Sequence, residues 1–179
     1  RIKRLGVKSS AEAIEPISQA AFVDNLVKLI SADPQDDRDL LLAKEKGVSG
    51  LFSKGLELGD DKILTARPLR KAFVEADDSK IATVVLGFFQ AISERWPSAW
   101  DKNNSESFLN TAVGLDLCFR LLKHYLNRSI QEYSDFLREL KSIDMDDEYF
   151  VTLDKSTTTV PRILALMVGD GADGKMQVK

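Results

Sequence analysis

The most explicit chemical motif lies at the C-terminal end of the chain, where glycines and a lysine have the spacing of phosphate-binding loops. Gly169, Gly174 and Lys175 fit the pattern G-x-x-x-x-G-K, and Gly171 adds a match to G-x-G-x-x-G. The first pattern requires Ser or Thr after the lysine, where this chain has Met176. Both patterns need a following helix whose N-terminus faces the phosphate, and too few residues remain for one. We therefore expect a flexible tail here and no nucleotide site.

Cys118 and His124 are the only thiol and the only imidazole, so they are the natural candidates for a nucleophilic pair. On one predicted helix, their spacing places them about 120° apart around the axis and more than one turn apart along it. They cannot reach each other, and we predict no catalytic residues. Cys118 is expected in the core, and His124 as a helix-end cation or a neutral surface ring. A single cysteine also excludes an internal disulfide, which favours a reducing, cytoplasmic location.

An acidic run later in the chain has the oxygen ligands that a hard cation prefers. It contains Asp144, Asp146, Asp147 and Glu148. The EF-hand pattern also requires a glycine at its sixth position and a distal Glu, and neither is in register. We interpret the run as a solvated acidic loop, and we expect neither a metal site nor a cofactor.

The densest basic cluster after the N-terminal residues comprises Arg67, Arg70 and Lys71. These are the candidate DNA-contacting residues, because Lys and Arg neutralise backbone phosphates. The cluster lacks interleaved aromatic residues, so a solvated side of a helix is the simpler interpretation. The whole chain has a formal net charge of −3, which does not favour a polyanion or an anionic membrane. Its longest apolar runs are far below the ~20 residues of a membrane-spanning helix, and we expect no membrane partner.

The stretch 79–127 organises the elements that must position these residues. Apolar residues recur at intervals of three and four from Ile81 to Trp96, which is the repeat of one buried helical face. The pattern repeats from Phe108 to Leu126, with a second apolar row beside it. The tryptophans of the intervening WPSAW segment are expected to be packing anchors of a turn. The predicted core residues are Phe88, Phe89, Ile92, Trp96, Trp100, Phe108, Leu115, Phe119 and Leu122.

The whole pattern predicts a mainly all-α fold, an irregular bundle of about six to seven helices around a central helix near 104–126. The segment 148–153 has the only strand signal, so at most one short strand is expected. Residues 1–13 are expected to be a linker or a remnant of an upstream domain, 14–168 a single helical domain, and 169–179 the flexible tail. The other expected helices are 14–30, one starting at Pro34, 65–76, 79–96, 129–142 and 162–168, with an anchored loop over 47–64.

Two capping patterns and one glycine refine the central region. Asn103 and Glu106 have the spacing of a capping box ahead of the central helix, and Ser129 with Glu132 has it ahead of the next helix. Gly114 lies inside the central helix, where it costs about 1 kcal/mol relative to Ala. We therefore expect another element to cross closely at Gly114.

Segments of the central stretch resemble a known protein family. Residues 88–92 (FFQAI), 96–100 (WPSAW) and 111–114 (TAVG) are similar to the helical C-terminal region of DGQHR-domain proteins. In that family a similar FF-x-A-(I/V) helix leads into a W/F-P-x-x-W turn and a helix with a T-x-G-like step. Residues 17–22 (ISQAAF) look like the segment that follows the signature domain. The similarity covers residues 14–126, and the signature Asp-Gly-Gln-His-Arg is absent.

The resemblance implies a bacterial protein associated with DNA modification, in a family that includes DndB-type regulators of DNA phosphorothioation. Because the signature is absent, no activity of the signature domain transfers to a residue of this chain, which is expected to be a protein fragment. The implied function is a non-enzymatic accessory or interaction module for DNA modification or phage defence, acting through protein or DNA contacts. Its expected partners are the upstream domain of the same protein, and DNA or a protein of the modification system.

Two alternatives to this module stay open. The chain could be part of an enzyme that processes nucleic acids or nucleotides, with catalytic residues upstream and a contribution from Asp60 and Asp61. It could also be an unrelated helical structural domain.

Overall fold

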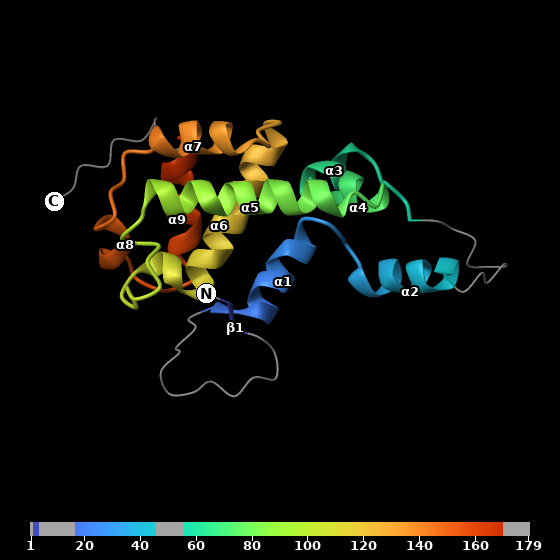
Figure 1. Cartoon of the computed structure of the whole chain (residues 1–179), viewed down its shortest axis with the longest axis horizontal. Helices are drawn as coiled ribbons and strands as arrows, with labels where there is room; N and C mark the ends of the chain where they lie inside the picture. Colours follow the sequence, from blue (N-terminus) through green and yellow to red (C-terminus); the bar gives the residue numbers. More distant parts are fainter. Residues whose placement is uncertain (1, 4–16, 46–55, 170–179) are drawn as a thin grey trace.

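The long helix α5 (Asp78–Arg95) runs through the middle of the molecule, and α6 (Ala112–Asn127) lies obliquely to it (Figure 1). The computed structural model describes residues 2–3, 17–45 and 56–169. Helix α7 (Tyr133–Lys141) packs along α5, and α9 (Thr159–Val168) packs against α6. The fold is a mainly α-helical multi-helix bundle, as predicted.

The other elements of the described residues are short. They are α1 (Gln19–Lys28), α2 (Pro34–Glu45), α3 (Asp61–Ala66), α4 (Arg70–Val74), the 3₁₀ turn η1 (Phe108–Asn110) and α8 (Tyr149–Thr152). The two-residue strands β1 (Ile2–Lys3) and β2 (Ile17–Ser18) pair in parallel. The described part thus holds nine α-helices rather than six to seven, because one predicted helix is split in two and the predicted strand is helical.

The core lies between the apolar faces of α5, α6, α7 and α9. Phe88 meets Phe136 edge-on with their ring centroids 5.4 Å apart, and Trp96 meets Phe150 at 5.0 Å. All nine predicted core residues belong to this core, seven of them buried and two partly buried at its margin. The aromatic residues of α5 therefore join α6, α7 and α8 into one packed unit.

The helix predicted over 65–76 is wrong, because α3 ends at Ala66 and α4 begins at Arg70. Pro68 lies between them, and a residue that precedes proline is disfavoured in the helical region. Arg67 accordingly has φ −136° and ψ 75°. Helix α3 begins inside the region expected to be a loop, because Asp60 caps it by accepting a hydrogen bond from Ile63 N at 2.8 Å.

The central helix α6 begins at Ala112 and not near 104, so the predicted capping box at Asn103 is wrong. Ser107 instead caps η1, and Thr111 caps α6 by accepting from the amide of Gly114 at 3.0 Å. Thr111 has extended backbone angles, φ −104° and ψ 163°, which separate η1 from α6. Several polar residues precede α6, and the structure uses a later one than the pattern indicated.

The close crossing expected at Gly114 is confirmed. A Cβ atom on Gly114 would lie 2.1 Å from the carbonyl oxygen of Phe108 and 2.8 Å from Cα of Leu109. The crossing element is the backbone of η1. Glycine is required here because of this close approach, and not because of its backbone angles.

Three predictions in the C-terminal third are corrected. Ser129 does not cap α7: it has φ 61° and ends α6, where the amide of Ile130 donates to the Tyr125 carbonyl at 3.0 Å. The strand predicted over 148–153 is helix α8, whose first amide, on Tyr149, donates to Asp146 Oδ1 at 2.9 Å. Helix α9 starts at Thr159, ahead of the predicted residue 162.

The structure leaves other predictions untested. The expected linker and tail lie outside the described residues, apart from β1 at one end and Gly169, which ends α9, at the other. Within the described ranges, no helix combines the length and hydropathy that crossing a membrane requires.

Candidate functional site

The three candidate DNA-contacting residues do not share one surface. Arg70 is only 7% exposed and pairs with Asp37 of α2 through two hydrogen bonds, of which that from Nη2 to Oδ1 measures 2.9 Å. Its Nε and Nη2 also donate to the carbonyl oxygen of Glu57, at 3.0 and 2.8 Å. Ser31 donates a further hydrogen bond to the Asp37 carboxylate. Arg70 is therefore a structural clamp that joins α2, α4 and the segment before α3, and the structure removes it from the candidate phosphate contacts.

The neighbours of Arg70 have different environments. Lys71 has a side chain that is 66% exposed, with Nζ 3.9 Å from a carboxylate oxygen of Glu75. Arg67 is partly buried, and its Nε has no hydrogen-bond partner among the described residues. These three residues are close in sequence but differ in exposure, and among them only Lys71 projects well into solvent.

The acidic run supports the tryptophan turn instead of a cation. Asp147 Oδ1 accepts from Ala99 N at 2.6 Å, and Trp96 Nε1 donates to the Met145 carbonyl at 2.8 Å. Arg95 extends the same support by donating to three carbonyl oxygens, those of Leu140, Ile143 and Met145. Among the residues that the structure describes, no group of three or more His, Cys, Asp or Glu side chains is placed to hold a metal ion.

The remaining chemical candidates are not brought together. Cys118 is buried in α6, and the ring of His124 lies further along the same helix, 5.8 Å from that of Tyr125. Asp60 caps α3, and Asp61 is the first residue of that helix. None of these four side chains lines the pocket described next.

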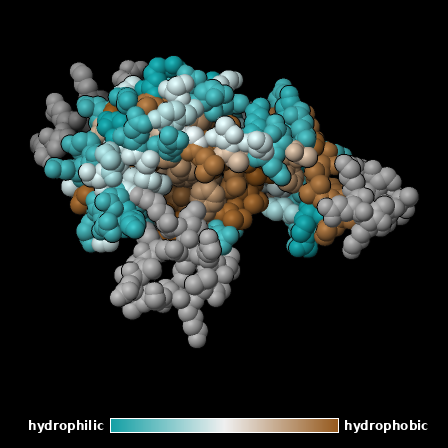
Figure 2. Space-filling model, viewed as in Figure 1, coloured by the Kyte–Doolittle hydropathy of each residue, from teal (hydrophilic) through white to brown (hydrophobic). Residues whose placement is uncertain are grey.

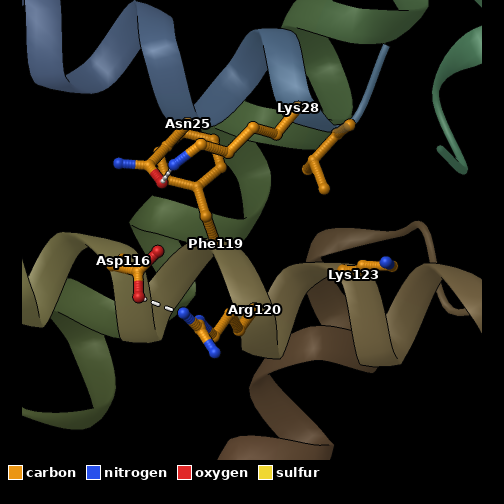
Figure 3. Close-up of a pocket in the computed structure, with 7 residues that line it drawn as sticks. Asn25, Lys28, Asp116, Phe119, Arg120 and Lys123 are labelled. Carbon is orange, nitrogen blue, oxygen red and sulfur yellow. Dashed lines mark hydrogen bonds and ion pairs between the residues drawn. The ribbon is translucent and has the colours of Figure 1, made fainter. Parts of the chain in front are cut away.

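A pocket of about 390 Å³ with a mixed polar and apolar lining lies between α1 and α6 (Figure 3). Its α6 wall carries Asp116, Arg120 and Lys123 at intervals of four and three, which places them on one helical face. Phe119 reaches from α6 toward α1 and forms the apolar back of the pocket (Figure 3). The complete lining is Asn25, Lys28, Leu29, Asp116, Phe119, Arg120 and Lys123.

Three cationic side chains and one carboxylate surround this pocket. The carboxylate, on Asp116, accepts a hydrogen bond from Arg120 Nε at 2.8 Å. Lys28 Nζ donates to Asn25 Oδ1 at 3.3 Å. Neither Lys28 nor Lys123 has a carboxylate partner within the described part of the chain. The pocket therefore has an excess of positive charge, although the chain as a whole carries −3.

Sequence reasoning missed this pocket. Arg120 and Lys123 recur on the polar side of the predicted central helix, so the sequence alone indicated the basic residues of the α6 wall. Lys28 belongs to a helix far earlier in the chain, and only the packing of α1 on α6 brings it to the same hollow. Here Phe22 of α1 lies 5.2 Å from Phe119 of α6, measured between ring centroids.

A second hollow of about 430 Å³, almost entirely apolar, lies between α1, α4 and α5. Figure 2 shows hydrophobic side chains gathered on this face of the molecule. Leu86, at its edge, is 68% exposed. Asp78 is the one charged residue of the lining, so the surface favours apolar contacts and offers little to direct a polar ligand.

Comparison with known proteins found no matching family model, no matching curated protein and no matching solved structure.

Proposed function

We propose that this chain is a non-enzymatic helical module that contacts nucleic acid through a phosphate group held in the pocket between α1 and α6. The observation that carries the proposal is the set of three cations around that pocket, two of which lack a carboxylate partner among the described residues. Lys and Arg are the residues with which proteins bind phosphate oxygens. The cluster on α4 is not part of this proposal, because Arg70 is buried and paired and Lys71 lies outside the pocket.

The setting that we propose is a bacterial DNA-modification or phage-defence system, with the chain as an accessory part of a DGQHR-type protein in the cytoplasm. The support is the resemblance of residues 88–92 and 96–100 to that family and the single cysteine. The coding sequence upstream of Arg1 tests the family. A stretch encoding Asp-Gly-Gln-His-Arg supports the assignment to this family, and a coding sequence without that stretch overturns it. Neither result affects phosphate binding, which is tested separately.

The phosphate contact is tested by fluorescence anisotropy with a labelled DNA duplex that carries 5′ phosphates. Binding is expected at low salt, with an affinity that falls linearly on a log–log plot against salt concentration. The double substitution Lys28→Ala/Lys123→Ala is expected to weaken binding at least about tenfold at low salt, because two phosphate-neutralising charges are lost.

A matched control removes the same charge elsewhere. Lys71 and Lys141 have side chains that are 66% and 60% exposed, and neither lines the pocket. Lys71→Ala/Lys141→Ala should therefore leave the affinity nearly unchanged. Equal weakening by both double variants would overturn the assignment to the pocket. No binding at low salt by the unaltered protein would overturn the function itself.

A further inference from the structure

We propose that the group recognised in the α1–α6 pocket is a phosphomonoester dianion, such as a terminal phosphate, and not the diester of a continuous nucleic-acid backbone. The inference rests on the proposed function, because it specifies which phosphate the same pocket would hold. Charge balance, the number of free phosphate oxygens and the placement of the donors each support it.

The charges around the pocket match a dianion. Lys28, Arg120 and Lys123 contribute three positive charges, and Asp116 contributes one negative charge, which leaves an excess of two. A phosphomonoester carries about −1.5 to −2 at pH 7, whereas a backbone diester carries a single charge. A monoester therefore neutralises the pocket, while a diester leaves it with unpaired charge.

The number of free phosphate oxygens also favours the end of a strand. The hollow lies between two helices, is open to solvent and has Phe119 at its back (Figure 3). Internal phosphates of a duplex carry the chain onward in both directions, so fewer of their oxygens are free to face the donors of a pocket. A terminal phosphate has only one ester bond and can enter with its three terminal oxygens leading.

One donor of the pocket, the ammonium group of Lys28, is positioned by its neighbour Asn25. Asn25 is only 8% exposed, and its Nδ2 donates to the Ala21 carbonyl at 2.9 Å, which turns its Oδ1 toward Lys28 Nζ. One ammonium proton of Lys28 is used in this way, and two are left for a ligand.

Arg120 is prepared for an oxyanion in a similar way. Its Nε is engaged by Asp116 at 2.8 Å, and its two terminal nitrogens make no hydrogen bond within the described residues. The outer edge of the guanidinium is thus available for a two-point contact with phosphate oxygens. Figure 3 shows the Lys123 head farther along α6, so the ligand has to draw this flexible side chain inward.

The experiment compares three labelled single strands of one sequence that differ only at the 5′ end: hydroxyl, phosphate and methyl phosphate. The methyl ester keeps the phosphorus but lowers the charge to that of a diester. We expect the 5′-phosphate strand to bind about tenfold more tightly than the other two, because only it offers a second charge to the pocket. Inorganic phosphate and AMP should compete with it, and inorganic phosphate is the probe for the bare ligand chemistry.

Variants test whether the preference for the 5′-phosphate strand arises at the pocket. Lys28→Ala and Lys123→Ala should each reduce it, Lys123→Arg should retain it, and Lys71→Ala should leave it unchanged. All three lysines lie in helices and none is buried, so the fold should tolerate each substitution, and a thermal melt of each variant verifies it. A preference that survives both Lys28→Ala and Lys123→Ala overturns the pocket as its source.

The outcomes separate this inference from the proposed function. Equal binding of all three strands overturns the inference and leaves the function standing. Direct binding of inorganic phosphate or AMP, measured by calorimetry, without binding of any strand supports the dianion site and overturns the nucleic-acid function. No binding of any probe at low salt overturns both.

Discussion

At the scale of single residues, Gly114 shows how an absent side chain can be essential. The nearest atoms to a Cβ there are backbone atoms of η1, which cannot yield without moving the whole turn. Gly114→Ala is therefore expected to lower the free energy of unfolding by about 2–3 kcal/mol, even though Ala favours the helix by about 1 kcal/mol. Urea unfolding followed by circular dichroism measures the change.

Gly87 of α5 is the matched control for that substitution. A Cβ there would meet Cβ of Tyr133 at 3.5 Å, which is an ordinary van der Waals contact. Gly87→Ala should be neutral or stabilising by up to about 1 kcal/mol, because only the helix preference changes. Similar losses at the two glycines would show that helix α6 does not depend on the approach of η1.

The buried pair of Asp37 and Arg70 makes stability depend on pH. Arg70→Met leaves the carboxylate without its cation, and we expect a loss of about 3–5 kcal/mol at pH 7. Burial by itself raises the pKa of Asp37, but the hydrogen bonds from Arg70 and Ser31 and the charge of Arg70 outweigh it, so the pKa lies below the usual 3.8. The ionised carboxylate therefore stabilises the fold above pH 3.8, and this contribution is lost as pH falls through the lower pKa of the folded state.

Asp37→Asn isolates that contribution. The variant should be less stable than the unaltered protein at neutral pH, and the difference should narrow as pH falls below 3.8. Thermal unfolding over a series of acidic buffers measures the difference. A gap that stays constant or widens toward acid would mean that the Asp37 carboxylate is not preferentially ionised in the fold.

Residues with local roles could be predicted from sequence, and residues with distant partners could not. The close approach at Gly114 and the packing of Trp96 follow from the repeat of the helices around them. Arg70 stands beside Lys71 in the sequence and has the same charge, and nothing local distinguishes them. Its burial follows from a carboxylate on another helix, Asp37, which only the folded chain brings near.

At the scale of elements, the turn after α5 depends on a side chain of the helix that precedes it. Arg95 donates to three carbonyl oxygens at and beyond the end of α7, at 2.8 to 3.1 Å. Arg95→Met keeps an apolar stem but removes these hydrogen bonds, so we expect a loss of about 2–3 kcal/mol. Arg138→Met, at a side chain that is 68% exposed, should cost less than about 0.5 kcal/mol. Equal melting temperatures for the two variants would mean that the packing of the tryptophans holds the turn without Arg95.

The predicted elements succeeded where a long apolar repeat defines them and failed where short polar segments compete. Helix α5 was located to within one residue of its start, because its apolar repeat continues over five turns. The start of α6 was misplaced because Asn103, Ser107 and Thr111 can all accept from a following amide. The structure selects Thr111, since η1 must first pass beneath Gly114.

At the scale of the whole molecule, the placement of α1 determines the two hollows described above, because α1 lines each of them. Phe22 lies within 5.7 Å of both Phe89 and Phe119, measured between ring centroids, and so wedges α1 against α5 and α6. Phe119→Ala is expected to cost about 3–5 kcal/mol and to weaken phosphate binding, because the back of the pocket is lost. Leu86→Ala, at a 68% exposed position, should change neither stability nor binding appreciably. Chemical unfolding and anisotropy measure the two effects, and a Phe119→Ala loss below about 1 kcal/mol would contradict this account of the core.

Helix α2 should be the first part of the described fold to open. It extends away from the bundle (Figure 1) and packs extensively against none of the other described elements, with Leu42 40% exposed. Its firmest attachment is the clamp of Asp37 and Arg70 near its first turn. Local opening of such a segment costs less free energy than unfolding the whole domain, so its amides should exchange hydrogen faster than those of α5 and α6. Hydrogen exchange followed by mass spectrometry measures this for each peptide.

Arg70→Met should accelerate exchange in α2 by more than the global loss of stability accounts for, because it releases the helix without unfolding α6. Exchange in α2 as slow as that in α6 would show that the projecting helix opens only when the whole domain unfolds.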